Sequence, residues 1–227
     1  MDHVDVLILG AGLSGVGSAC HLEAKRPGTT YAILEARDAI GGTWDLFRYP
    51  GVRSDSDMFT LGYSFEPWVG DKAIADGPSI LEYIRTTAHT HGIEDKIRFH
   101  RRAVAASWST AEARWTVEVE CTGGGGREEI TCGCLWGTTG YYRYVQGYRP
   151  DFPGEERFGG TLVHPQHWPG DLEWVDRRIV VIGSGATAVT LVPALAERAA
   201  HVTMLQRSPT YIVARPGEDR MADSLRR

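Results

Sequence analysis

Two glycine-rich loops constrain this chain more than any other feature, because each has the surroundings of a dinucleotide-binding turn. The first loop, residues 10–15, follows the apolar run 4–9, which predicts a strand buried on both faces. A helix is predicted from residue 14 to residue 25, and residues 31–35 predict a second strand. That strand ends in Glu35, at about 20 residues beyond the last glycine, where a dinucleotide site uses a carboxylate to bind ribose hydroxyls. The first 35 residues therefore predict a dinucleotide-binding βαβ unit.

The glycines of the first loop have separate physical roles. Gly10 allows the tight turn, and Gly12 allows the backbone to approach a pyrophosphate. Gly15 allows the helix to pack closely on the strand. The pyrophosphate is expected at the helix N-terminus, where unpaired N–H groups and the dipole favour an anion. The alternative is a glycine turn that binds nothing, which a GxGxxG pattern alone does not exclude.

The second loop repeats this unit. Residues 178–182 predict its first strand, Gly183, Gly185 and Ala188 occupy the glycine positions, and residues 201–205 predict its second strand. Arg207 follows where the first unit has an acid. A guanidinium can bind a ribose 2′-phosphate with two parallel hydrogen bonds, whereas a carboxylate would repel it. The second loop therefore predicts NADP rather than NAD, unless Arg207 is only a solvated charge at a strand end.

Composition excludes several other classes of protein. The chain has 227 residues, a net charge of −5 and 23% charged residues, which gives no support for nucleic-acid binding. No stretch approaches the roughly 18 apolar residues of a membrane span, and the first residues lack the basic region of a signal peptide. We therefore expect a cytoplasmic protein without a transmembrane segment. The four cysteines contain no CxxC pair and the histidines no HExxH spacing, so neither a redox dithiol nor a metal site is expected.

The segments between and around the loops complete the predicted fold. A shaped loop is expected over residues 39–53, an amphipathic helix over 78–91, and short antiparallel strands between residues 97 and 134. The Tyr-, Pro- and Gly-rich residues 141–170 are typical of an interdomain connection. The prediction is an α/β fold of two Rossmann-like dinucleotide-binding units with a small antiparallel β insertion, the second unit incomplete. Its parts are an FAD-binding domain over 1–140, a linker over 141–170, and the start of an NADP-binding domain over 171–227.

A motif within the linker carries a resemblance to a known family. Phe158, Gly160, His164 and Trp168 fit the pattern FxGxxxHxxxW, here placed between two dinucleotide motifs. This pattern resembles the identifying sequence of class B flavoprotein monooxygenases of the Baeyer–Villiger type. Residues 41–51, 183–195 and 204–209 look similar to the subgroup that contains ethionamide monooxygenase.

The resemblance implies a flavin- and NADPH-dependent monooxygenase. FAD would occupy the first site and NADPH the second, and hydride transfer would reduce the flavin. Oxygen would then give a C4a-peroxyflavin, which inserts one oxygen atom into a ketone or adds it to a sulfur or nitrogen atom. The implied partners are O2 and a small-molecule ketone or thio-compound.

The resemblance also implies roles for individual residues. The FAD fingerprint would comprise Gly10, Gly12, Gly15 and Glu35, and Gly42, Thr43 and Trp44 would follow the flavin ring. Asp55 would be the acid that orients a catalytic arginine near the flavin, and His164 and Trp168 would couple domain movement to the cofactors. The NADPH site would comprise Gly183, Gly185, Ala188, Arg207 and Ser208.

Simpler interpretations compete with three of these assignments. Asp55 could cap the following turn, Trp44 could fill the core, and His164 could be structural.

Family members are longer than this chain, and their C-terminal part would complete both domains and supply the catalytic arginine. No arginine of this chain is assigned that role. Two hypotheses follow: a monooxygenase, or a truncated, inactive FAD- and NADP-binding fragment. A second unit with only two strands would leave an open sheet edge, which favours self-association. A pyridine-nucleotide disulfide reductase would share the two-loop plan but needs the absent CxxC.

Overall fold

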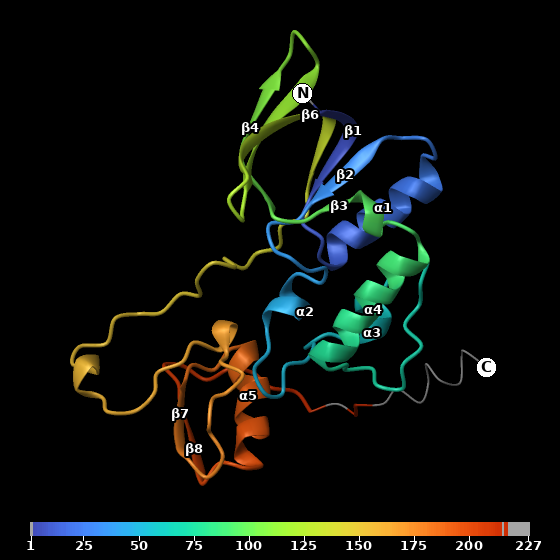
Figure 1. The fold of residues 1–227 in the computed structure, drawn as a ribbon. Helices are drawn as coiled ribbons and strands as arrows, with labels where there is room; N and C mark the ends of the chain where they lie inside the picture. Colours follow the sequence, from blue (N-terminus) through green and yellow to red (C-terminus); the bar gives the residue numbers. More distant parts are fainter. Residues whose placement is uncertain (1, 215, 218–227) are drawn as a thin grey trace. The chain divides into compact units, whose positions relative to one another are not determined.

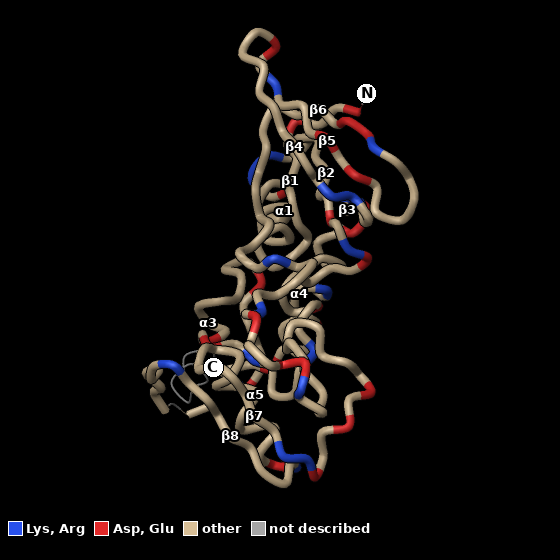
Figure 2. Tube along the Cα trace, turned by 90° about the vertical axis from the view of Figure 1, so that its left-hand side faces the viewer, with Lys and Arg blue, Asp and Glu red and all other residues tan. Residues whose placement is uncertain are grey.

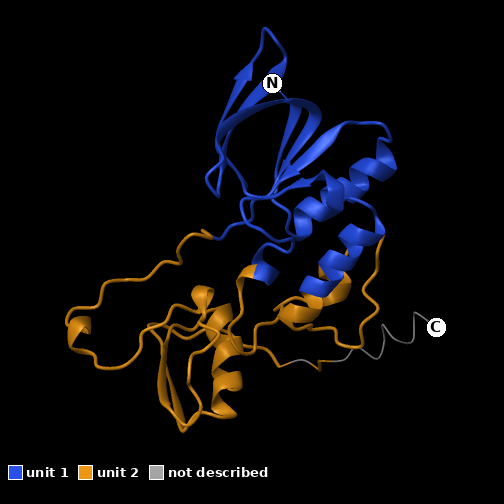
Figure 3. Ribbon diagram, viewed as in Figure 1, with its two compact units in different colours: residues 1–45, 81–142 blue, residues 46–80, 143–227 orange. Residues whose placement is uncertain are grey.

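The computed structural model describes residues 2–214, 216 and 217. The chain divides into two compact units, residues 1–45 with 81–142 and residues 46–80 with 143–227 (Figure 3). The predicted boundaries at residues 140 and 170 divide the chain differently and stay a prediction.

A six-stranded sheet in the order β3-β2-β1-β6-β5-β4 forms the centre of the first unit (Figure 1). Its parallel part has β1 (Asp2–Leu9) between β2 (Tyr31–Leu34) and β6 (Gly126–Gly137), with β3 (Ile97–Arg98) beside β2. All four residues of β2 are buried, as expected for an apolar strand of a parallel sheet.

The antiparallel insertion continues the same sheet. It consists of β4 (Arg101–Ser109) and β5 (Arg114–Cys121), which pair with each other, and β5 also pairs with β6. The last strand of the insertion also belongs to the parallel part: residues 126–132 of β6 pair with β5, and residues 130–137 pair with β1. The core of this sheet includes Val4, Leu7, Val117 and Ile130.

Helices position the loops around this sheet. Helix α1 (Leu13–Lys25) buries Val16, Ala19 and Leu22, and it ends before the Pro27–Gly28 turn. The short α2 spans Thr43–Leu46 and α4 spans Gly77–Thr90, in agreement with the predicted amphipathic helix; a 3-10 turn, Glu94–Lys96, leads into β3.

The start of α4 is held by Asp76. Its carboxylate accepts hydrogen bonds from the backbone N–H and the hydroxyl of Ser79, at 3.0 and 2.8 Å. Although partial burial opposes ionisation, these bonds and the nearby Lys72 hold the pKa of Asp76 below its usual value.

The second unit contains the second βαβ element. Strands β7 (Arg178–Ile182) and β8 (His201–Leu205) are parallel, and helix α5 (Ala186–Ala196) connects them. Phe47 and Tyr49 pack with Leu191 and Leu195 of α5 in the core of this unit. The unit also contains α3 (Met58–Leu61) and the 3-10 turns Glu155–Arg157 and Pro165–His167.

Charges of both signs are interspersed along the described chain (Figure 2). Ion pairs between strands of the first unit, such as Arg101 of β4 with Glu128 of β6 at 2.6 Å, are examples. Within residues 2–214, 216 and 217, no helix combines the length and apolar character needed to cross a membrane.

Candidate dinucleotide sites

The first glycine loop is built by close backbone packing. Gly10 has a φ of +106°, and its N–H donates to the carbonyl of Leu34 at 2.7 Å. A Cβ on Gly10 would lie 2.8 Å from the carbonyl oxygen of Thr138, and one on Gly15 only 1.8 Å from the carbonyl oxygen of Gly10. Gly10 and Gly15 are therefore glycines because the turn and the approach of α1 leave no room for a side chain.

Gly12 differs from these two glycines. It is the N-cap of α1 in an extended conformation, with a φ of −82°, and a Cβ there would make only an ordinary contact of 3.6 Å with Gly42 Cα. The helix end receives no hydrogen bond from the Gly12 position, which has no side chain, and the first turn of α1 contains no acidic residue. The internal packing of this unit does not require glycine here. An uncapped helix end with open backbone fits a pyrophosphate.

Glu35 lies against this loop at the end of β2. Its side chain is 5% exposed, its Oε2 accepts from the Ala11 N–H and its Oε1 from the Arg37 N–H, both at 2.9 Å. A carboxylate has about four acceptor positions, so these two bonds leave capacity for ribose hydroxyls. The predicted partners Gly10, Gly12, Gly15 and Glu35 are thus together in one unit.

The segment that follows is attached to the loop. The Gly41 N–H donates to the Ala11 carbonyl at 3.0 Å, which places Gly42 beside Gly12. Thr43 and Trp44 lie in α2 and are both partly buried.

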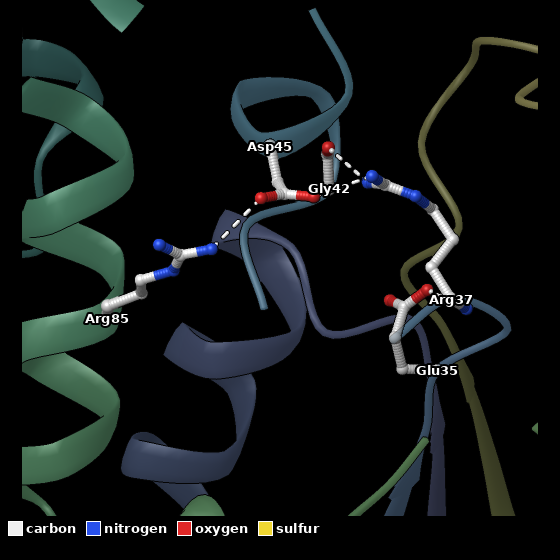
Figure 4. A network of polar contacts seen from close by, with 5 residues as sticks. All are labelled: Glu35, Arg37, Gly42, Asp45 and Arg85. Carbon is white, nitrogen blue, oxygen red and sulfur yellow. Dashed lines mark hydrogen bonds and ion pairs between the residues drawn. The ribbon is translucent and has the colours of Figure 1, made fainter. Parts of the chain in front are cut away.

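Three residues that the sequence did not single out form an ion cluster here (Figure 4). Asp45 Oδ2 is 2.5 Å from Arg37 Nη2, and Asp45 Oδ1 is 2.9 Å from Arg85 Nη2. An acid eight residues after an arginine, across a glycine turn, was a weak signal for the first pair. Nothing in the spacing of α4 indicated Arg85.

The second glycine loop repeats the first one. The Gly183 N–H donates to the Leu205 carbonyl at 2.8 Å, the counterpart of the Gly10 bond, and Gly183 has a φ of +126°. Gly185 is the N-cap of α5, and the first turn of this helix also contains no acidic residue. A Cβ on Gly183 or Gly185 would meet nothing within 4 Å, so open space surrounds this loop, which fits a second pyrophosphate.

The end of β8 is joined to this loop. The Ser184 hydroxyl donates to the Ser208 carbonyl at 3.1 Å, so Ser208 lies beside the loop and the exposed Arg207 directly precedes it. Ala188 is buried in α5. The second set of predicted residues is thus together in the second unit.

Asp55, also in the second unit, has a different environment. It is exposed, while the N-cap of α3 is Asp57, whose Oδ1 accepts from the Thr60 N–H at 2.9 Å. The competing interpretation, a cap on the following turn, applies to Asp57 in this structure. His164 accepts from the Gln166 N–H at 3.2 Å, and Trp168 packs against the core of the second unit.

Two family models match the chain. Residues 8–69 match an NAD(P)-binding Rossmann-like domain, and residues 70–223 match the flavin-binding monooxygenase-like family.

Curated relatives agree with this match. The FAD-containing monooxygenase EthA of Mycobacterium tuberculosis is 58% identical over 227 residues, which are 100% of this chain and 46% of that protein. The putative FAD-containing monooxygenase MymA of the same species is 56% identical over 100% of this chain and 46% of its own length. The chain thus spans about half the length of the curated relatives it matches.

Solved structures give the same result. A steroid monooxygenase bound to NADP superimposes with a TM-score of 0.80 at 30% identity, over 92% of this chain and 39% of that one. A cyclohexanone monooxygenase from Rhodococcus bound to NADP+ gives 0.78 at 28% identity, over 93% and 39% of the two chains. With a family model that matches most of its length and relatives that match it throughout, this chain belongs to the flavin-binding monooxygenase-like family.

Proposed function

We propose that this chain binds FAD at the first glycine loop and NADPH at the second, as part of a monooxygenase. The observation that carries the proposal is the repeated turn with unlike strand ends. Both loops hold their first glycine by the same backbone hydrogen bond, yet β2 leads into the buried Glu35 and β8 into the exposed Arg207. A carboxylate suits free ribose hydroxyls and a guanidinium suits a ribose phosphate.

Within the first site, the proposed binding residues are Gly10, Gly12, Gly15 and Glu35, with Gly42, Thr43 and Trp44 along the flavin ring. The second site would use Gly183, Gly185, Ala188, Arg207 and Ser208. Asp55 is proposed to orient a catalytic arginine near the flavin. The bound, reduced flavin would supply the oxygen chemistry, through a C4a-peroxyflavin, and the chain would orient the cofactors and exclude water.

The reaction we propose adds one oxygen atom of O2 to a small molecule, either beside a ketone carbonyl or on sulfur or nitrogen. Proteins similar to this chain support the proposal. Structural likeness to cyclohexanone and steroid monooxygenases favours oxygen insertion beside a ketone carbonyl, the Baeyer–Villiger reaction. The similarity to EthA and MymA, which are named as FAD-containing monooxygenases, supports FAD as the cofactor. The OTEMO protein, whose structure is a complex with FAD and NADP, has a TM-score of 0.79 at 29% identity.

A second candidate is a binding-only polypeptide that needs further chain for turnover. The observation that favours it lies in the second unit, where Val180, Ile182 and Leu205 of the two-stranded sheet are 60%, 56% and 56% exposed. Apolar side chains that are this exposed on strands are usually buried by further chain or by another molecule, and self-association would bury them.

Isotope incorporation distinguishes these candidates. The 227-residue chain is incubated with FAD, NADPH and 18O2, together with a cyclic ketone or a thioether. We expect a lactone or sulfoxide that carries one 18O atom. Consumption of neither substrate, with both nucleotides bound, would contradict monooxygenase activity of this chain and support the binding-only candidate.

A further inference from the structure

A buried carboxylate shared by two arginines lies beside the proposed flavin segment. Asp45 is 4% exposed and pairs with Arg37 at 2.5 Å and with Arg85 at 2.9 Å (Figure 4). A buried charge is costly unless it is paired and hydrogen-bonded. Here each carboxylate oxygen accepts from its own guanidinium, and we call the three residues the Asp45 triad.

The triad joins three segments that are separate in the sequence. Arg37 follows β2, Asp45 lies in α2 and Arg85 in α4. Arg37 also donates through Nη1 to the Gly42 carbonyl at 3.2 Å, so one guanidinium holds both residue 42 and residue 45. Because the backbone N–H of Arg37 donates to Glu35, the same residue also contacts the strand-end acid.

The other side of residues 41–45 is fixed to the glycine loop and to α4. Besides its hydrogen bond to Ala11, Gly41 has a φ of +125°, and a Cβ there would lie 2.2 Å from Leu81 Cδ1. This segment is thus held between the loop, Leu81 of α4 and the triad, whose residues all belong to the first unit.

We propose that Asp45 is a positioning residue for the flavin ring. Acting through Arg37 and Arg85, it holds residues 42–44 at a set place beside the glycine loop. This inference rests on the proposed function, because it assumes FAD in the first site. The pyrophosphate and adenosine part of the ligand would contact the loop and Glu35, and Glu35 meets the triad only through the backbone N–H of Arg37, which does not depend on Asp45. Loss of the triad should therefore affect the flavin half of FAD more than its ADP half.

The test compares FAD with ADP, which lacks the flavin. Binding of each to the 227-residue chain is measured by titration, with flavin absorbance recorded as a second signal. Asp45→Asn keeps the side-chain volume but removes the charge. We expect FAD to bind about tenfold more weakly, a change equivalent to one charged hydrogen bond. The affinity for ADP should be unchanged. The flavin absorbance band should lose its resolved shoulders, because the ring would no longer be held in one place.

Two further variants make the result decisive. Arg85→Met removes the more exposed arginine, leaves Asp45 paired with Arg37, and should shift FAD affinity in the same direction even if Asp45→Asn does not fold. Arg102→Met removes the ion pair between Arg102 of β4 and Glu120 of β5, and it should change the affinity for neither FAD nor ADP.

The outcomes separate this inference from the proposed function. Equal weakening of FAD and ADP would indicate a general structural role and overturn the inference, as would unchanged FAD affinity in Asp45→Asn and Arg85→Met. Both of these results leave FAD binding by the wild-type chain intact. If the wild-type chain itself bound no FAD, the proposed function would fail and the inference with it.

Discussion

In the proposed function, a single residue at each of the two strand ends selects the dinucleotide that the loop accepts. Glu35 was identified from its spacing after the glycine loop, and the structure places its carboxylate against the Ala11 N–H. That prediction was possible because the βαβ unit is local in sequence. The Asp45 triad was not predictable in the same way: Arg85 is 40 residues from Asp45, and the apolar periodicity of α4 describes its buried face alone.

Arg207→Ala tests the assignment of the second loop at this scale. Loss of the guanidinium should weaken NADPH binding about tenfold to a hundredfold, which is the range for a charged hydrogen bond. It should weaken NADH binding much less. The dissociation constants of both nucleotides, measured by calorimetry, check this. Arg102→Ala, a charge change on β4, is the matched control. Equal losses for NADPH and NADH in Arg207→Ala would remove the 2′-phosphate assignment.

At the scale of elements, the turn between β1 and α1 contains glycines that the fold requires and one, Gly12, that the internal packing does not require. Gly15 is where α1 meets the loop backbone, whereas Gly12 has room for a Cβ. The sequence pattern contains both and cannot distinguish them, because the distinction depends on which atoms lie opposite each residue in space.

A pair of alanine substitutions tests this separation. Gly15→Ala should destabilise the first unit by about 1–3 kcal/mol or more, because α1 must shift to accommodate the new Cβ. Gly12→Ala should cost less than about 1 kcal/mol, since its φ suits any residue. Gly12→Ala should still weaken FAD binding, because the new methyl group would lie where the pyrophosphate approaches the loop. Thermal unfolding by circular dichroism and FAD titration measure the two effects; the reverse order of stabilities would contradict the account.

Strand β6 shows the limit of local pattern at the element scale. Residues 130–132 of this strand are buried in succession, and the residues before and after them are exposed or partly buried. The buried residues are those that pair with both β5 and β1, so the pattern follows the neighbours of one strand rather than marking a new strand. Periodicity reports what covers a strand's two faces, so a strand whose partners change midway resembles two strands.

At the scale of the whole molecule, we propose that one chain carries two different dinucleotide sites. The two loops, the Rossmann-like units and the family were accessible from sequence, because each rests on a motif with its own local geometry. The packing of residues 47–51 against α5 was not, since it joins segments about 140 residues apart, as in the Tyr49 to Thr190 contact of 3.3 Å.

Anaerobic reduction of the bound flavin tests whether both dinucleotide sites work in this chain. The chain is loaded with FAD, freed of excess cofactor and mixed with NADPH without oxygen while flavin absorbance is recorded. We expect the yellow band to bleach with NADPH, and to bleach far more slowly with NADH at the same concentration. A protein that retains no flavin, or whose flavin stays oxidised while NADPH is bound, would contradict this proposal.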